Sequence, residues 1–100
     1  MDMRNIYLKN NLFKEDIVIQ IKFDKDNNKS IAYDENEKIG ECDYIEAEGC
    51  WNIIHTEVSN SYQGQGIARK LVECVIENSK KFNKTLIADC SYAKKVIENK

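Results

Sequence analysis

Two glycines in the second half of the chain have the spacing that most clearly allows chemistry. Gly64 and Gly66 stand in the segment SNSYQGQG, residues 59–66, just before a stretch with helical periodicity. Glycine lets the backbone turn sharply, and the first N–H groups of a helix have no acceptor inside it. Together with the helix dipole, such a loop is able to bind a phosphate or pyrophosphate group. A plain loop is the alternative, because neither a Walker A nor a complete dinucleotide motif is present.

A second group of reactive side chains consists of one histidine, a nearby glutamate and four cysteines. His55 and Glu57 are two residues apart in a segment with strand-like composition, so we expect them on one face of that strand. No C-x-x-C pair occurs among the cysteines, which argues against a structural zinc site. We therefore predict no metal and four free thiols in a reducing, cytoplasmic environment.

The composition restricts the class of protein. The chain has 100 residues, 42% apolar and 32% charged, which is typical of one globular domain. A formal net charge of −2 argues against a general nucleic-acid binder. No apolar run reaches the roughly 18 residues of a membrane span, and we expect no signal peptide. Negative charge is concentrated in residues 1–50 and positive charge in residues 51–100, so an anionic ligand is expected in the second half. Two solvated faces of unequal charge are the alternative.

The periodicity of apolar residues predicts the elements that position these groups. Residues 1–16 receive no assignment. Four antiparallel strands with short polar turns are predicted at 17–23, 30–33, 39–46 and 50–58. A helix is predicted from Ile67 to Phe82, a buried strand at 85–88 and a last helix at 93–99. Trp51 is predicted to lie in the core. The fold class is α+β, with a mixed sheet flanked by helices.

Three ordered motifs carry a resemblance to a known family. QGQGIA at residues 63–68 resembles the acetyl-CoA pyrophosphate motif [QR]-x-x-G-x-[GA] of the GCN5-related N-acetyltransferases. HTEV at 55–58, YQGQGIARKLV at 62–72 and DCSY at 89–92 are similar to the small single-domain, YjdJ-type branch of that superfamily. The similarity extends from about Ile17 to Ile97. It implies a single acetyltransferase domain over residues 1–100, with a mostly antiparallel sheet and two splayed strands at the site for coenzyme A.

The resemblance also implies how acetyl-CoA would lie. Its pyrophosphate would contact backbone N–H groups in the loop, formed by Gln63, Gly64, Gln65, Gly66, Ile67 and Ala68. Arg69 or Lys70 would lie near a phosphate, although both residue types are also common on any solvated helix face. The pantetheine arm would lie between the splayed strands, with the Val58 backbone on one side and the strand of residues 85–90 on the other.

Four side chains are candidates for catalysis in this interpretation. Glu57 or His55 would take a proton from the attacking amine, because an amine must be neutral to attack a thioester. Cys90 or Tyr92 would protonate the leaving thiolate, and Cys90 is also a candidate for a covalent acetyl intermediate. A helix start after Cys90 favours a reactive thiol. For each of these residues a structural role in packing or on a solvated face is the alternative.

The expected function is acetyl transfer from acetyl-CoA to an amine, either a small molecule or a protein lysine. Two other classes remain open. The chain could bind coenzyme A without useful catalysis and act with a partner protein, or it could be an interaction domain with no ligand. Neither the acceptor nor the oligomeric state follows from the sequence.

Overall fold

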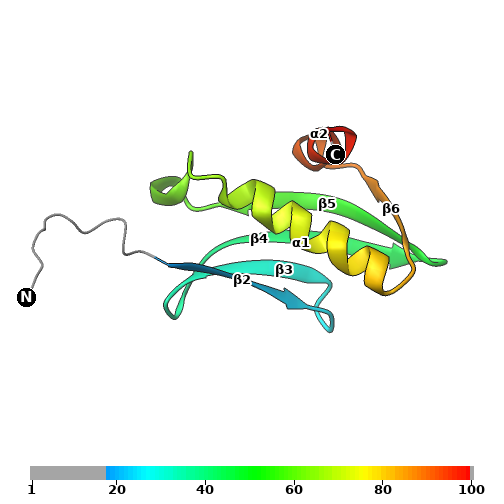
Figure 1. Ribbon diagram of the computed structural model, residues 1–100, viewed down its shortest axis with the longest axis horizontal. Coiled ribbons are helices and arrows are strands. Elements are labelled where there is room, and N and C mark those ends of the chain that lie inside the picture. The colour runs from blue at the N-terminus through cyan, green and yellow to red at the C-terminus, as the bar shows by residue number, and fades with distance from the viewer. Residues whose placement is uncertain (1–17, 100) are drawn as a thin grey trace, which may run out of the picture.

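A computed structural model describes residues 18–99, so the unassigned segment 1–16 lies outside the described residues. Five strands form one sheet in the order β2-β3-β4-β5-β6. All neighbours are antiparallel except β5 and β6, which are parallel. Figure 1 shows the sheet with α1 crossing it. The strands are β2 (Ile19–Asp24), β3 (Lys29–Asp34), β4 (Glu37–Ala47), β5 (Cys50–Val58) and β6 (Thr85–Ala88).

The turns between the first four strands follow the local chemistry of the chain. Asn28, Glu35 and Glu48 have positive φ angles of 58°, 55° and 54°. Asparagine tolerates this left-handed region well, and the two glutamates show that turn geometry can impose it on other residues. The antiparallel meander predicted from the sequence is confirmed, with strand limits that differ by a few residues from the predicted ones.

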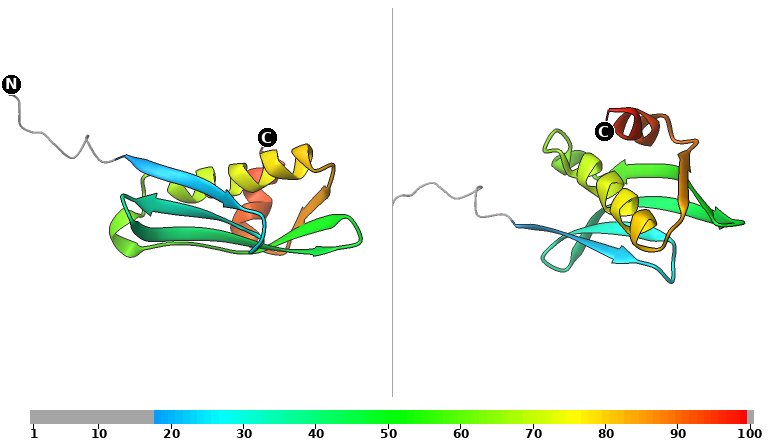
Figure 2. Two further views of the ribbon diagram at one scale, coloured as in Figure 1. Left: turned by 90° about the horizontal axis from the view of Figure 1, so that it is seen from below. Right: turned by 45° about the vertical axis from the view of Figure 1, so that its right-hand side comes forward.

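The helix α1 (Ile67–Lys81) covers one face of the sheet (Figure 2). Leu71, Val72 and Val75 are fully buried, and the Ser30 hydroxyl donates a hydrogen bond of 2.8 Å to the Leu71 carbonyl. This bond fixes the middle of the helix over β3. Trp51 is fully buried, as predicted.

The last helix, α2 (Ser91–Glu98), begins two residues before the predicted limit. The N–H groups of Asp89 and Cys90 both donate to the Ile53 carbonyl, at 3.0 Å each, and this ends the strand β6 abruptly. Ser91 and Tyr92 are then free to form the first helical turn. Ala93 and Val96 bury this helix against the same core as α1.

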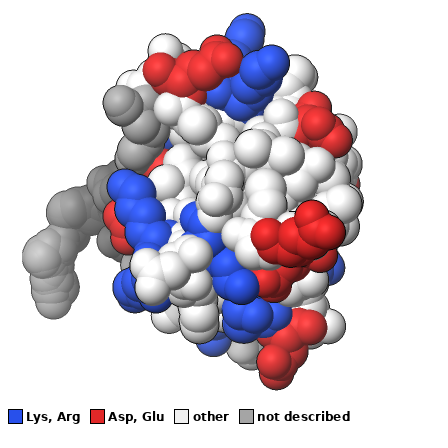
Figure 3. Space-filling view, turned by 90° about the vertical axis from the view of Figure 1, so that its right-hand side faces the viewer, with Lys and Arg blue, Asp and Glu red and all other residues white. Residues whose placement is uncertain are grey.

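The far end of the molecule, around the turn between β4 and β5, carries an aromatic cluster. Phe23, Tyr44 and Trp51 stack with ring centroids 4.2–6.1 Å apart, and Phe82 is tilted against them. The Lys25 ammonium lies 5.4 Å from the Phe82 ring. Figure 3 shows that acidic and basic side chains both occur at this end. Neither helix in residues 18–99 is long and apolar enough to cross a membrane.

Candidate functional site

The two parallel strands β5 and β6 are paired only along the first half of β5 and then separate; we call this point the fork. They pair only from Cys50 opposite Thr85 to Ile53 opposite Ala88, whereas β5 continues to Val58. Asn52 and Asp89 link the strands at the fork through two hydrogen bonds. The Asn52 side-chain NH₂ donates to the Asp89 carboxylate at 3.0 Å, and the Asp89 backbone N–H donates to Asn52 Oδ1 at 2.9 Å. The second half of β5 is therefore paired with β4 on one side and not with β6 on the other.

The glycine loop lies at the open end of this fork. A short 3-10 helix, η2 (Asn60–Tyr62), leads from β5 into it. Gly64 and Gly66 have φ angles of 81° and 79°, so both need the left-handed conformation that glycine adopts freely. A Cβ at either position would meet no atom within 4 Å. The space above the loop is thus open to a ligand.

Gly66 is the N-cap of α1, and the loop therefore feeds directly into the helix. The first bond of the helix runs from the Lys70 N–H to the Gly66 carbonyl, so the amides of Ile67, Ala68 and Arg69 precede the ladder. The first turn contains no acidic residue. These features favour an anionic group at this point.

A cavity of about 580 Å³ joins the open fork to the glycine loop. Eight residues predicted for the site line it: Glu57, Val58, Gln63, Gly64, Gly66, Ile67, Ala68 and Tyr92. Thr56 and Tyr62 also line it, and neither was predicted from the sequence as a site residue. Position gives the only available signal for Thr56, since it lies between His55 and Glu57.

Gln63 is engaged within the loop. Its backbone N–H donates to the Asn60 carbonyl at 3.3 Å, and its side-chain amide donates to the Val58 carbonyl and to Asn60 Oδ1, both at 3.1 Å. Val58 was predicted to offer its backbone to the pantetheine arm. The Gln63 side chain holds that carbonyl in this structure, so a ligand that pairs with it would take the place of the amide.

The structure places the two predicted phosphate partners outside the cavity lining. Arg69 Nε lies 3.0 Å from Glu73 Oε2, one helical turn further along α1. Lys70 lines a separate depression together with Ile21, Cys74 and other residues. Gln65 is exposed and also outside the lining.

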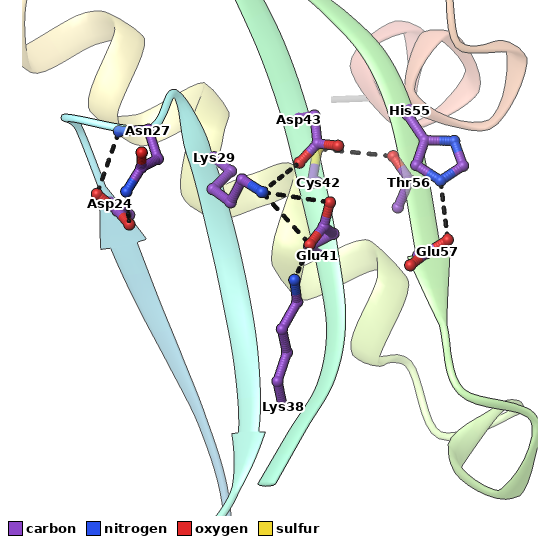
Figure 4. A network of polar contacts seen from close by, with 10 residues as sticks. All are labelled: Asp24, Asn27, Lys29, Lys38, Glu41, Cys42, Asp43, His55, Thr56 and Glu57. Carbon is purple, nitrogen blue, oxygen red and sulfur yellow. Dashed lines mark hydrogen bonds and ion pairs between the residues drawn. The ribbon is translucent and has the colours of Figure 1, made fainter. Parts of the chain in front are cut away.

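His55 and Glu57 share one face of β5, as the spacing predicted. His55 Nε2 lies 3.0 Å from Glu57 Oε1, and Figure 4 shows the contact. The hydrogen bond to Glu57 raises the pKa of His55 above its ordinary value. Glu57 lines the cavity and His55 does not, so the carboxylate is the member of the pair closer to a bound ligand.

A network of charges continues from this pair across the same face of the sheet (Figure 4). Glu41 forms ion pairs with Lys38 and with Lys29, and Lys29 also lies 3.7 Å from Asp43. The hydrogen bond from Lys38 lowers the pKa of Glu41 to about 2, whereas burial raises the pKa of Asp43. Two lysines thus balance two carboxylates beside Glu57.

Cys90 reaches the cavity wall through a neighbour. Its thiol lies 3.6 Å from the Thr56 hydroxyl oxygen, and that hydroxyl lies 3.5 Å from the Cys42 sulfur. Burial raises the pKa of Cys42 to about 12. All four cysteines are free, and no cluster able to hold a metal ion is found among residues 18–99.

Comparison with known proteins gives matches in sequence and in structure. The family model described as GCN5-related N-acetyl-transferase matches residues 29–100. An NMR solution structure of a GCN5-like protein from Staphylococcus aureus is 36% identical, with a TM-score of 0.61, and the match covers 80% of this chain and 78% of that one. No curated protein sequence matches.

More distant structures share the fold alone. Ribosomal-protein-alanine N-acetyltransferase from Brucella melitensis is 16% identical with a TM-score of 0.56, over 71% of this chain and 60% of that one. N-acetylglutamate synthase from Neisseria gonorrhoeae, complexed with coenzyme A and N-acetyl-glutamate, is 18% identical with a TM-score of 0.57. That match covers 68% of this chain but 19% of the synthase.

Proposed function

The chain belongs to the GCN5-related N-acetyl-transferase family, and we propose that it transfers the acetyl group of acetyl-CoA to an amine. The observation that carries the proposal is the cavity of about 580 Å³ where the open fork meets the glycine loop. The part of acetyl-CoA that runs from the diphosphate through the pantetheine arm to the thioester would suit this arrangement. The coenzyme A in the related synthase structure supports the same ligand class.

The chain offers distinct groups to each part of acetyl-CoA. The N–H groups of Ile67, Ala68 and Arg69, at the start of α1, would donate hydrogen bonds to the diphosphate, which the helix dipole would also stabilise. The backbone of Ile54–Val58 does not pair with β6 on the side away from β4, and it would pair with the pantetheine amides as an added strand once the Gln63 amide leaves the Val58 carbonyl. The thioester would then lie near Thr56, Glu57 and Tyr92.

Glu57 is our proposal for the general base. An ammonium group has no lone pair, so the acceptor must lose a proton before its nitrogen attacks the thioester carbonyl. Glu57 lines the cavity and would take this proton directly or through a water molecule, while His55 hydrogen-bonds the carboxylate from behind. As the carbon–sulfur bond breaks, the thiolate needs a proton, and Tyr92 in the lining or Cys90 beside Thr56 would donate it.

Cofactor binding is tested by titration calorimetry with coenzyme A and acetyl-CoA on the full chain. Gly66→Ala adds a methyl group that faces the open space above the loop. Gly49→Ala is the matched control, because Gly49 has a φ of 78°, also meets nothing within 4 Å, and lies in the distant turn between β4 and β5. We expect about a tenfold or greater loss of affinity in Gly66→Ala, which corresponds to about 1.4 kcal/mol, and none in Gly49→Ala. Equal affinity in both variants, or no binding by the unaltered chain, contradicts the proposal.

Catalysis is tested by incubating the chain with acetyl-CoA and a panel of amines and lysine peptides. Glu57→Gln should lower the rate by about 10²-fold or more, while Glu48→Gln, in the exposed β4–β5 turn, should leave it unchanged. Binding without turnover on every amine would instead support a coenzyme A-binding module that acts with a partner. Intact mass after incubation with acetyl-CoA alone tests the covalent variant: an acetyl adduct that disappears in Cys90→Ala supports it.

A further inference from the structure

Thr56 lies between two thiols at the wall of the cavity. Its hydroxyl oxygen is 3.6 Å from the Cys90 sulfur and 3.5 Å from the Cys42 sulfur, and the residue itself lines the cavity. Figure 4 shows Thr56 on β5 pointing toward Cys42 on the adjacent strand β4. Cys90 approaches from the other side, at the start of α2. One hydroxyl therefore connects the strand β4 with the start of α2.

The chemistry of the three groups sets the direction of these hydrogen bonds. A hydroxyl has one proton to donate and two lone pairs to accept. Cys42 is fully buried and keeps its proton, because burial raises the pKa of this thiol to about 12. The Thr56 hydroxyl donates to the Cys42 sulfur and accepts the Cys90 S–H bond.

The same hydroxyl has a second use when Cys90 loses its proton. A thiolate is an acceptor only, and the Thr56 O–H is able to rotate from the Cys42 sulfur to the Cys90 sulfur. Hydrogen bonds to ionised groups are stronger than those between neutral ones. The Asp89 carboxylate, next to Cys90 in the chain, is directed to the Asn52 amide at 3.0 Å.

We propose that Thr56 is a positioning residue for Cys90. Its hydroxyl holds the Cys90 thiol beside the cavity wall and donates a hydrogen bond to the thiolate form. The part of the proposal that concerns the position of the thiol rests only on the geometry of Cys42, Thr56 and Cys90. A contribution of Thr56 to acetyl transfer through Cys90 rests in addition on the proposed function.

Alkylation by iodoacetamide tests the proposal without acetyl-CoA, because only the thiolate reacts. Peptide mass mapping follows Cys90, with the half-buried Cys50 as internal control, since the Cys50 thiol donates to the Trp51 carbonyl and not to Thr56. Thr56→Val keeps the shape and removes the hydroxyl. We expect Cys90 to react at least about fivefold more slowly in Thr56→Val and at a nearly unaltered rate in Thr56→Ser, with Cys50 unaffected in both.

A variant that is expected to raise the alkylation rate of Cys90 distinguishes the proposal from a simple loss of packing around Thr56. Cys42→Ala removes the acceptor that competes for the Thr56 proton, so Cys90 should react faster than in the unaltered chain. This acceleration should vanish in the double variant Cys42→Ala with Thr56→Val. An unchanged Cys90 rate in Thr56→Val, or equal slowing in Thr56→Val and Thr56→Ser, overturns the proposal. If Thr56→Val fails to fold, the Cys90 alkylation rates of Cys42→Ala and Thr56→Ser are compared instead. A faster rate in Cys42→Ala and an unaltered rate in Thr56→Ser supports the proposal. An unaltered rate in both variants overturns it.

The same variants separate this proposal from the proposed function. If acetyl transfer uses Cys90, Thr56→Val should lower kcat with little change in KM, and Thr56→Ser should restore it. Failure of coenzyme A to bind in the calorimetric titration would remove the proposed function, while the alkylation rates would still report on Thr56 and Cys90.

Discussion

Glu57 is the residue at which the separate parts of the site meet. It lines the main cavity and also a neighbouring one of about 400 Å³, which Lys38, Ser59 and other residues complete. It also holds the imidazole of His55. A side chain shared by two adjacent cavities is well placed to act on a proton between two bound molecules. This position, which spacing along the chain does not reveal, separates Glu57 from the other candidates.

The pair His55–Glu57 leads to a prediction about pH. Because the hydrogen bond that the imidazole donates to Glu57 raises the pKa of His55 in the folded chain, the pair stabilises the fold fully below the ordinary histidine pKa of about 6.5. That contribution is lost as the pH rises through the raised value. The chain has one histidine, so proton NMR follows it without assignment. We expect a titration midpoint above that of a free histidine, and a lower midpoint in Glu57→Gln.

Glu48→Gln is the control for this titration, since Glu48 is exposed in the turn between β4 and β5. The two substitutions remove the same charge from the chain. An equal shift of the His55 midpoint in both variants would mean that overall charge, and not the contact with Glu57, sets the pKa of the imidazole.

The ion pairs of Glu41 lead to a different dependence of the stability on pH, at acidic values. Lys38 lowers the pKa of Glu41 to about 2, so its ion pairs stabilise the fold above the ordinary value of about 4.3 and fail as the pH falls toward 2. Urea unfolding of Glu41→Gln should show about 1 kcal/mol less stability at pH 7 and a smaller loss between pH 4.5 and pH 2. Asp43 acts in the opposite direction because burial raises its pKa. For that reason the difference between the variant and the unaltered chain is the quantity to measure. A difference that does not change with pH contradicts the prediction.

At the scale of elements, local patterns predicted the strands and the two α-helices of residues 18–99, though not the 3-10 helix η2. These patterns were alternation, β-branched and aromatic composition, short apolar runs and helical periodicity. The strand 50–58 and the strand 85–88 have the predicted limits, because polar or glycine-containing turns bound them sharply. The irregularities in pairing were not predicted. Register shifts between Ala32 and Tyr33 and between Asp43 and Tyr44 depend on how two strands face each other, which no single segment of sequence encodes.

The site divides in the same way. The loop was predictable because glycine at 64 and 66 is a local requirement of the backbone, and the resemblance to a family motif lay in the same residues. Thr56, Tyr62 and the engaged amide of Gln63 were not, because each depends on a contact between elements. Tyr62, for example, anchors the loop through a hydrogen bond from its hydroxyl to Asp34, at the end of β3.

Gly40 is another position whose importance appears only when elements meet. An added Cβ would lie 2.9 Å from the Glu57 carbonyl oxygen, 3.2 Å from Val58 Cγ2 and 3.3 Å from Leu71 Cδ1. Gly40→Ala should therefore displace the end of β5 and lower the free energy of unfolding by about 2 kcal/mol. Urea unfolding measures the loss, and amide NMR shifts should report movement at Glu57 and Val58.

Gly49→Ala is the comparison for this substitution, since its methyl group meets nothing within 4 Å. It carries the cost of a positive φ, about 1 kcal/mol, and should leave the amides of Glu57 and Val58 in place. Unchanged amide shifts at these two residues in Gly40→Ala would contradict the close approach of β4, β5 and α1.

At the scale of the whole molecule, a single core joins both helices to the sheet. Ala93 and Val96 of α2 belong to the same buried cluster as Leu71 of α1 and Trp51 of β5. We therefore expect α2 to unfold together with the rest. Trp51 fluorescence and far-UV circular dichroism should give coincident urea transitions. Val96→Ala should lower the free energy of unfolding by about 2 kcal/mol and move both transitions equally.

Lys95→Ala, on the exposed side of the same helix, should change the stability by less than about 0.5 kcal/mol. If Val96→Ala altered the circular dichroism transition and left that of Trp51 in place, α2 would be a separately unfolding unit.

The open half of β5 has a further consequence for how the molecule behaves in a concentrated solution. Ile54–Val58 have backbone groups on the side where β6 has already turned away, and among these groups the Val58 carbonyl is held by the Gln63 side chain. A strand edge without a neighbouring strand is a template on which other chains can add. This edge lies next to the cavity of about 580 Å³, because Thr56, Glu57 and Val58 line that cavity. A ligand that fills the gap would also act as a cap against self-association, so stored samples without coenzyme A should scatter more light over time than samples saturated with it.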